Sequence, residues 1–307
     1  MSQLSTKDLV SILDLSREDL AKIFATVRDQ KPQARAKTLA ASHRNRVLAC
    51  IFHKPSLRTR VSFEVAMHQL GGTSMFITER EIGLASRESV EDVARVLSRY
   101  VDAIMIRTFD HGHVEKLAEH ASIPIINGLT DLSHPCQILA DVFTVEEALG
   151  GIEGRKVVYV GDGNNIAHSW INAAALMDFE LVICTPSDYE PNPDVVAAAR
   201  AKGELNLSVV GDPAVAVKDA DVVYTDVWAS MGQEDEAAKR EKIFAPYQLN
   251  GELMKGAKES AIVLHCLPAH RGLEITDEVM DGPQSRVYEE AENRLHVQRA
   301  IISLLVD

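Results

Sequence analysis

The sequence predicts an α/β protein with two similar domains, each built from a parallel β-sheet flanked by helices. First, short apolar runs of strand type alternate with longer segments of helical periodicity along the whole chain. Second, 307 residues, 46% of them hydrophobic, are enough for two domains with substantial cores. Third, a long helical segment separates two such series, which places the junction near residues 135–150.

The first series opens with residues 47–52, a short apolar run typical of a buried strand. Pro55 turns the chain out of this strand, Ser56 is a good N-cap for the following helix, and Gly71 is a stop signal behind it. The same signals predict the other elements of this half. Strands are expected at 47–52, 74–78, 102–106 and 123–126, and helices at 16–29, 57–70, 89–100, 113–120 and 135–149.

The second series begins after Gly150 and Gly151 end the long helix. Strands are expected at 156–160, 180–184, 207–210, 221–225 and 261–265, with helices between them. The last segment, 289–306, has the pattern of a second long helix, which we expect to pack back on the first domain. The predicted domains are therefore 1–140 with 289–307, and 141–288.

Charge and composition limit the classes of partner. The formal net charge of −13 argues against nucleic-acid binding, because phosphate backbones require a broad basic surface. No apolar run reaches the roughly 18 residues that a membrane helix needs. The N-terminus carries no secretory signal pattern, and the four cysteines are widely spaced with no paired framework. We therefore expect a reduced cytoplasmic enzyme, with Cys50 and Cys184 as buried thiols.

The segment Ser56-Leu57-Arg58-Thr59-Arg60 predicts an anion site. It lies where a strand ends and a helix begins, so unpaired backbone N–H groups, hydroxyls and guanidinium groups meet at one point. Arg58 adds a fork that fits phosphate. A capped helix with surface arginines is the alternative, but the coincidence of strand, proline, cap, hydroxyls and arginines favours phosphate.

Two further segments follow strands of the first half. Arg107 comes directly after the strand 102–106, at the sheet edge where ligands gather in open α/β folds, although it also suits a solvated loop. His134 and Gln137 are about one helical turn apart and can point at one ligand, although a capped helix start explains them as well. His134 and Cys136 alone lack the ligand set of a zinc site, so we expect no metal.

The turn at 161–165 resembles the opening of a dinucleotide site, and NAD binding is its obvious alternative. The fingerprint, however, needs glycine or alanine at 166, where this chain has Ile166. No acidic residue ends the next strand, where Cys184 stands instead. We favour a tight turn that presents Asn165 to a small molecule.

Two loops of the second half complete the set. Asp226, Ser230 and Met231 follow the strand 221–225 on a glycine-bearing loop, typical of a lid or specificity loop, although an ordinary loop with an Asp turn is the plainer alternative. Cys266 ends the strand 261–265; covalent catalysis is not favoured, because His265 alternates to the opposite strand face. Pro268 after Leu267 predicts a sharp turn, which a cis bond would suit.

Together these six segments resemble the ornithine carbamoyltransferase family, within the aspartate/ornithine carbamoyltransferases. The resemblance spans nearly the whole chain, in the family's order of motifs. The motifs at 134–137, 226–232 and 265–268 are similar to those of the ornithine-specific members of the family. It implies carbamoyl transfer from carbamoyl phosphate to the δ-amine of L-ornithine, giving L-citrulline and phosphate for arginine biosynthesis, with no cofactor. It also implies a trimer, or an assembly of trimers, with active sites between subunits.

The resemblance also implies roles for particular residues. Ser56, Leu57, Arg58, Thr59 and Arg107 would hold the phosphate, and Arg107, His134, Gln137 and Arg294 the carbamoyl group. Asn165, Asp226, Ser230 and Met231 would hold the α-amino and α-carboxylate groups of ornithine, with Cys266 and Leu267 beside its side-chain amine. Arg58, Arg107, His134, Cys266, Leu267 and Arg294 are the expected catalytic set.

Two departures from the family pattern stand out. Leu57 replaces the threonine of many members, where a backbone N–H would suffice. In the loop 78–87, many members place a glutamine that reaches the neighbouring subunit's carbamoyl phosphate, and this chain offers Glu81. A carboxylate there would repel a dianion unless Arg80 or Arg87 intervenes. We assign no site residue to this loop.

Three alternatives to ornithine transfer remain. One is transfer to another amine, such as putrescine or N-acetylornithine, against which Asp226, Ser230 and Met231 argue because they suit a free amino acid. Another is an NAD-dependent oxidoreductase. The last is a non-catalytic protein that kept only the fold, against which the full set of arginines argues.

Overall fold

Two parallel sheets organise the chain, one in each of two units. The computed structural model describes residues 4–230, 232 and 234–306. The chain divides after Ala140 and again after Glu292, so the last helical segment joins the first unit.

The first sheet has the strand order β2-β1-β3-β4, with every neighbouring pair parallel. Its central strands are almost fully buried, which explains why they read as continuous apolar runs rather than alternating ones. The strands are β1 (Val47–Phe52), β2 (Thr73–Thr78), β3 (Ala103–Arg107) and β4 (Ile125–Leu129).

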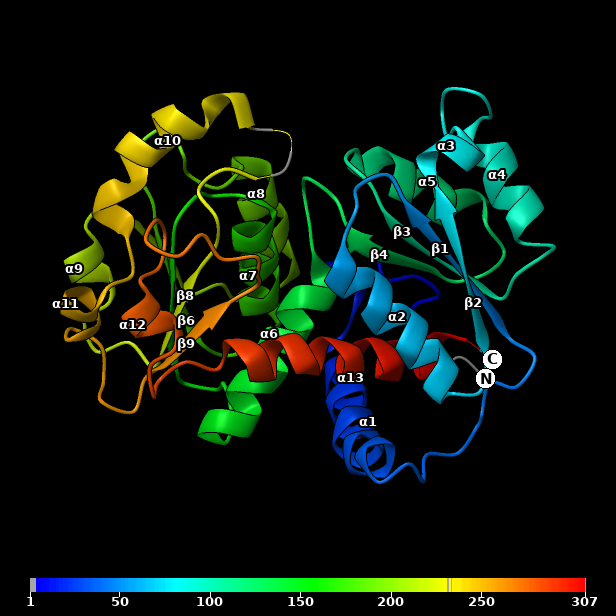
Figure 1. The fold of residues 1–307 in the computed structure, drawn as a ribbon, viewed down its shortest axis with the longest axis horizontal. Coiled ribbons are helices and arrows are strands. Elements are labelled where there is room, and N and C mark those ends of the chain that lie inside the picture. Colours follow the sequence, from blue (N-terminus) through cyan, green and yellow to red (C-terminus); the bar gives the residue numbers. More distant parts are fainter. Residues whose placement is uncertain (1–3, 231, 233, 307) are drawn as a thin grey trace. The chain divides into compact units, whose positions relative to one another are not determined.

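Helices cover both faces of this sheet (Figure 1). Ala49 and Ile51 of β1 pack in one cluster with Val93 of α4 and Val114 of α5, which therefore cover one face. On the opposite side lies α2, which buries Phe63 and Met67. The helices of this half are α1 (Arg17–Arg35), α2 (Leu57–Gln69), α3 (Glu79–Ile82), α4 (Val90–Leu97) and α5 (His111–His120), after the short 3-10 turn η1 (Ile12–Asp14).

The second sheet has the strand order β7-β6-β5-β8-β9, again parallel throughout. One face carries Val158 and Val223, which pack with Phe244 and Met254 in a cluster formed by α9 to α12. The Trp170 ring of α7 packs edge-on against the Tyr224 ring, with ring centroids 5.6 Å apart, so α7 covers the opposite face. The strands are β5 (Lys156–Val160), β6 (Glu180–Cys184), β7 (Leu207–Val210), β8 (Val222–Thr225) and β9 (Ile262–His265).

The helices of the second half differ in length. The short helices α9, α11 and α12 come between β7 and α13 in the sequence and pack on the sheet face that carries Val158 and Val223. The helices are α6 (Pro135–Leu149), α7 (Asn165–Leu176), α8 (Pro193–Lys202), α9 (Pro213–Ala216), α10 (Ala237–Phe244), α11 (Gly251–Met254), α12 (Asp277–Met280) and α13 (Val287–Leu305), with 3-10 turns η2 (Glu234–Glu236) and η3 (Ala245–Tyr247).

The C-terminal helix packs on the first unit, as the sequence predicts. Arg299 donates to Gln69 at 2.6 Å and to Gln30 at 3.2 Å, and His43 contacts the carbonyl of Val306 at 3.0 Å. The two Arg299 bonds join α13 to α2 and α1, and the His43 contact holds the residue after α13. The predicted fold class, two parallel-sheet α/β domains with a returning C-terminal helix, is confirmed.

Several element boundaries differ from the predicted ones. The strand β4 begins at Ile125, because Pro124 has no N–H for the ladder, and it continues through the polar Asn127 to Leu129. The helix α1 continues past Pro32 to Arg35, and the loop 78–87 contains the short helix α3. Within the described residues, no helix is long and apolar enough to span a membrane.

Candidate active site

The parallel register of the first sheet brings the predicted anion ligands to one edge. Phe52 pairs with Arg107, and Arg107 pairs with Leu129, so β1, β3 and β4 end together. The loops that follow carry Ser56 and His134. Strand direction therefore collects residues that are about 80 positions apart in the sequence at one edge of the sheet.

Ser56 caps α2, as predicted from the sequence. Its hydroxyl accepts the N–H of Thr59 at 3.3 Å and donates to the Thr59 hydroxyl at 3.1 Å. Arg294 of α13 donates to the same Thr59 hydroxyl at 2.7 Å. The structure thus brings Arg294 to the first turn of α2, more than 200 residues away in the chain.

His134 is the electrostatic centre of this edge. The residue is only 4% exposed. Burial lowers the pKa of its imidazole well below the ordinary value, and the positive charges of Arg294, Arg107 and Arg58 lower it further. The imidazole is therefore neutral near pH 7, and a neutral imidazole can donate one hydrogen bond without adding charge.

The residues beside His134 divide into ligand candidates and structural ones. Gln137 is buried on the first turn of α6, and its backbone N–H donates to the carbonyl of His134 at 3.2 Å. Cys136 instead donates its thiol to the carbonyl of Asn127 at 3.5 Å. Burial raises the pKa of this thiol to about 12, so Cys136 is neither a nucleophile nor a ready metal ligand.

The two departures from the family pattern have different structural contexts. The side chain of Leu57 is 76% exposed, which leaves its backbone N–H, at the first position of α2, as its polar group. The carboxylate of Glu81 caps its own helix, accepting the Thr78 N–H at 2.7 Å and the Thr78 hydroxyl at 2.8 Å. Arg87 donates to the Glu81 carbonyl at 2.9 Å.

Lys54 is a residue of this edge that the sequence analysis missed. Its ammonium pairs with Asp131, and it lies 4.0 Å from the centroid of the Phe109 ring. These contacts join the loop after β1 to the loops after β3 and β4. The available signal was a lysine directly before the Pro55-Ser56 turn, but its partners lie too far along the chain to be inferred.

The second sheet gathers its own set of loops. Val160 pairs with Thr225, and Thr225 pairs with His265, so β5, β8 and β9 end side by side. The turn 161–165, the loop after Asp226 and the Cys266 turn therefore share one edge.

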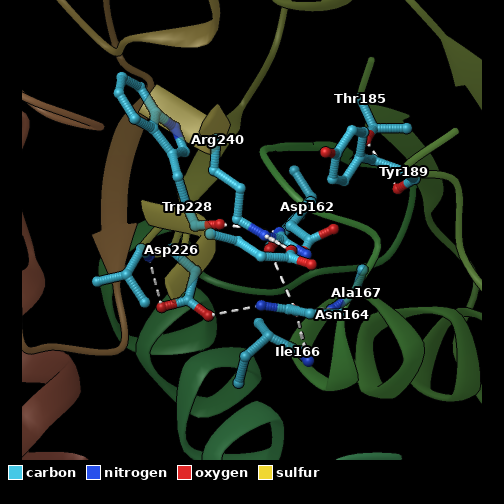
Figure 2. A network of polar contacts seen from close by, with 12 residues as sticks. Asp162, Asn164, Ile166, Ala167, Thr185, Tyr189, Asp226, Trp228 and Arg240 are labelled. Carbon is cyan, nitrogen blue, oxygen red and sulfur yellow. Dashed lines mark hydrogen bonds and ion pairs between the residues drawn. The ribbon is translucent and has the colours of Figure 1, made fainter. Parts of the chain in front are cut away.

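Asn164, rather than Asn165, is the organising residue of the first turn (Figure 2). Its side-chain oxygen accepts the N–H of Ile166 at 2.9 Å and of Ala167 at 3.3 Å, which caps α7. Its amide nitrogen donates to Asp226 at 2.9 Å. Asn165 is the half-buried first residue of α7. Adjacent asparagines give no sequence signal for which of them caps the helix.

These bonds weigh against a dinucleotide site. A bound pyrophosphate needs the free N–H groups at the start of the helix. In this turn Asn164 already occupies those of Ile166 and Ala167.

Both carboxylate oxygens of Asp226 accept hydrogen bonds. One accepts from the Asn164 amide, and the other accepts the N–H of Val227 at 2.8 Å and the thiol of Cys266 at 2.9 Å. Asp226 itself is only 6% exposed. A carboxylate fixed in this way is a suitable partner for a substrate ammonium group.

Cys266 remains a thiol. Burial raises its pKa well above the ordinary value, and the neighbouring charge of Asp226 raises it further. His265 does not act on it: one ring nitrogen accepts the N–H of Leu267 at 2.9 Å and the other bonds Glu274 at 3.0 Å. The bond between Leu267 and Pro268 is cis, which confirms the expected sharp turn.

One cluster among the described residues has metal-ligating atoms close together. Those of Asp226, His265 and Cys266 lie within 4.8 Å of one another. Each is engaged in the hydrogen bonds given above, and the raised thiol pKa disfavours the thiolate that a metal requires. We interpret the cluster as a hydrogen-bond network.

The loop after Asp226 is partly described. Ser230 is half-buried, whereas Met231, a predicted ornithine ligand, lies outside the described residues. Two further residues of this edge were missed from the sequence: Asp162 and Arg240, which form an ion pair at 2.8 Å. A single arginine on a polar helix carries no signal for a partner 78 residues away.

Comparison with known proteins gives a consistent result across the chain. Residues 7–147 match the carbamoyl-P binding domain of aspartate/ornithine carbamoyltransferases, and residues 153–305 match the Asp/Orn binding domain. The ornithine carbamoyltransferase of Syntrophus aciditrophicus is 52% identical over 98% of this chain and 99% of its own. The Pyrococcus furiosus relative, named as anabolic, is 50% identical over 99% and 97%.

Solved structures agree with the sequence relatives. The ornithine carbamoyltransferase of Pyrococcus furiosus superposes with a TM-score of 0.95 at 48% identity, covering 100% of this chain and 98% of the other. The anabolic enzyme of Campylobacter jejuni gives a TM-score of 0.91 at 34% identity, covering 98% and 99%. With two matching domain models and relatives at about half identity over full length, the chain belongs to the aspartate/ornithine carbamoyltransferase family.

Proposed function

We propose that this protein is an ornithine carbamoyltransferase, which transfers the carbamoyl group of carbamoyl phosphate to the δ-amine of L-ornithine. The observation that carries the proposal is the group of Arg58, Arg107 and Arg294 around the buried, neutral imidazole of His134. Positive charge and one neutral donor suit a substrate with a dianionic phosphate next to an uncharged carbonyl. The family membership of the whole chain supports the same activity.

The phosphate group is assigned to the start of α2. We propose that Ser56, Leu57, Arg58 and Thr59 bind it together with Arg107, using the backbone at Leu57 because that side chain is exposed. His134, Gln137, Arg107 and Arg294 then bind the carbamoyl group. The domain 1–140 with the C-terminal helix is accordingly the carbamoyl phosphate domain, and 141–288 is the ornithine domain.

The amino-acid half of the substrate is assigned to the second edge. We propose that Asp226 binds the α-ammonium, with Asn165, Ser230 and Met231 completing the site for the α-amino and α-carboxylate groups. Cys266 and Leu267 lie beside the δ-amine. Because the Cys266 pKa is raised, the thiol orients this amine and does not attack the substrate.

The reaction needs no covalent enzyme intermediate. The neutral δ-amine attacks the carbonyl carbon, negative charge develops on the carbonyl oxygen, and the bond from carbon to the phosphate oxygen breaks. The departing phosphate accepts the amine proton, so atoms and charge balance in L-citrulline and phosphate. Arg58, Arg107, Arg294 and the His134 N–H stabilise the developing charge. This scheme uses no metal or redox cofactor.

Citrulline formation is a step of arginine biosynthesis, and we propose that direction, with which the anabolic relative agrees. We also propose a cytoplasmic location. All four cysteines are free in the structure, as is usual for proteins of the reducing cytoplasm.

The family resemblance further supports a homotrimer or an assembly of trimers. Sedimentation equilibrium should give three times, or a multiple of three times, the chain mass of 33.7 kDa, and a monomer or dimer would contradict this.

The activity itself is tested by an acceptor comparison. Purified protein with carbamoyl phosphate is supplied with L-ornithine, putrescine, N-acetylornithine or L-aspartate, and carbamoylated product is quantified. We expect strong turnover with L-ornithine alone. Turnover with only another amine would leave the assignment of the phosphate residues standing and overturn that of Asp226 and its loop.

Replacing Arg58 by alanine should reduce kcat by about 10²- to 10³-fold with little effect on folding, because it removes one preorganised donor to developing charge. Steady-state kinetics and a thermal melt measure the two effects. Arg60→Ala is the matched control on the same helical turn: its guanidinium is exposed and paired with Glu64 at 3.0 Å. Near-normal turnover in a folded Arg58→Ala protein would contradict the scheme.

The pH profile should report the substrate amine. An alkyl ammonium has a pKa of about 10.4, so kcat/KM for ornithine should rise about tenfold per pH unit between about pH 6 and 7.5, and less steeply once the α-ammonium that Asp226 binds begins to lose its proton. His134 adds no inflection there: its pKa is lowered, so it is already neutral at pH 6. An inflection near pH 6.5 that disappears in His134→Asn would show that this assignment is wrong.

Cys266 should react slowly with iodoacetamide. Its raised pKa keeps the thiolate fraction small, so alkylation at pH 8 should be at least about tenfold slower than for an ordinary thiol. Asp226→Asn removes the adjacent negative charge and should accelerate the reaction. Mass spectrometry of the Cys266 peptide over time measures both rates, with the chain in denaturant as the control. Rapid alkylation at pH 7 would mean that Cys266 is a thiolate.

A further inference from the structure

Arg240 of α10 connects three separate segments at the edge of the second sheet (Figure 2). One guanidinium nitrogen donates to the Asp162 carboxylate at 2.8 Å and to the backbone carbonyl of Trp228 at 3.0 Å. Its Nε donates to Glu236 at 3.2 Å, one helical turn earlier. Its guanidinium also lies 5.0 Å from the ring centroid of Tyr189, in the loop after β6.

The segments that Arg240 joins are the ones that hold Asp226. Asp162 precedes, by two residues, the Asn164 that donates to Asp226 at 2.9 Å. Trp228 follows Asp226 by two residues and leads directly to Ser230. The Trp228 ring is fixed in turn by stacking on Phe244, with ring centroids 6.2 Å apart. Arg240 thus sets the spacing between the turn that orients Asp226 and the loop that follows it.

The charge balance gives Arg240 a second effect. Burial raises the pKa of Asp162, Arg240 opposes that shift, and the negative charges of Asp226 and Glu236 add to it. The side chains of Arg240 and Asp162 are only 8% and 11% exposed, so water screens this pair weakly. By pairing with Asp162, Arg240 leaves Asp226 as the carboxylate that a substrate ammonium meets.

We propose that Arg240, through its bonds to Asp162 and Trp228, is a positioning residue for the amino-acid end of L-ornithine. This inference rests on the proposed function and adds a residue to it. Arg240 acts through Asn164, Asp226 and the loop to Ser230 and needs no contact with the reacting atoms. It should therefore affect ornithine binding and leave carbamoyl phosphate binding unchanged.

The same sheet provides a second Arg–Asp ion pair for comparison, in which Arg155 is 32% exposed and Asp221 also pairs with Lys258. Arg155 donates to Asp221 at 3.2 Å, where Arg155 precedes β5 and Asp221 precedes β8. The Arg155 pair thus joins the amino ends of β5 and β8, whereas Arg240 of α10 bonds to Asp162 and Trp228, which follow the carboxyl ends of these two strands. A purely structural contribution of an Arg–Asp pair would appear in both.

The test compares Arg240→Gln, Arg240→Lys, Asp162→Asn and Arg155→Gln in the intact protein. We measure KM for ornithine, KM for carbamoyl phosphate, kcat and the thermal midpoint. Arg240→Gln should raise KM for ornithine about 10- to 100-fold, the factor that corresponds to losing a few kcal/mol from a buried ion pair. KM for carbamoyl phosphate should stay within about twofold, and Arg240→Lys should give an intermediate value because it retains the charge.

The control separates position from stability. Arg155→Gln should lower the thermal midpoint while leaving KM for ornithine within about twofold. Asp162→Asn should raise KM for ornithine, and in combination with Arg240→Gln should add little to it, as expected for two members of one interaction. If Arg240→Gln does not fold, Arg240→Lys and Asp162→Asn provide the same comparison.

Three outcomes would overturn the proposal: an unchanged KM for ornithine in Arg240→Gln, an equal rise in both KM values, or an equal effect of Arg155→Gln. Each presupposes that the unmodified protein carbamoylates ornithine. If the unmodified protein lacks that activity, the proposed function fails instead, so the two failures are distinguishable.

Discussion

The parallel direction of the strands is the constraint on which the polar edge of each sheet depends. In each sheet, every neighbouring pair of strands is parallel, so the carboxyl ends of adjacent strands meet at one edge. The residue at or just after a strand end is then delivered to that edge whatever its position in the chain. Arg107 ends β3, and Asp226 and Cys266 directly follow β8 and β9. Polar chemistry concentrates there because the strands themselves are apolar and buried.

The two edges use charge in opposite ways. In the first unit, three arginines and a buried imidazole produce a positive site in which His134 has to be neutral. In the second unit, carboxylates dominate, and their negative charge is distributed over defined donors: Asn164 and Cys266 for Asp226, and Arg240 for Asp162. A dianionic phosphate and a cationic amino acid are the complementary partners of such sites. The charges of Asp226, Asp162 and Arg240 in the second unit are paired or hydrogen-bonded, as burial requires.

The site is supported by residues that do not need to touch substrate. Lys54 joins the loops of the first edge, and Arg240 joins those of the second. His265 and Glu274 hold the turn that carries Leu267, through bonds of 2.9 and 3.0 Å. These contacts hold the loops at each edge in place beside the candidate ligand residues.

The sequence by itself determined the α/β class, the elements of both sheets and most of the polar loops. These are local properties: apolar runs, Pro55, the Ser56 cap and glycine stops act within a few residues of one another. Only the tertiary structure decided that Asn164 caps α7, that Glu81 caps α3, and that Lys54 and Arg240 each connect loops at a sheet edge. It also decided the protonation of His134 and Cys266, because a pKa depends on burial and on charges from distant segments.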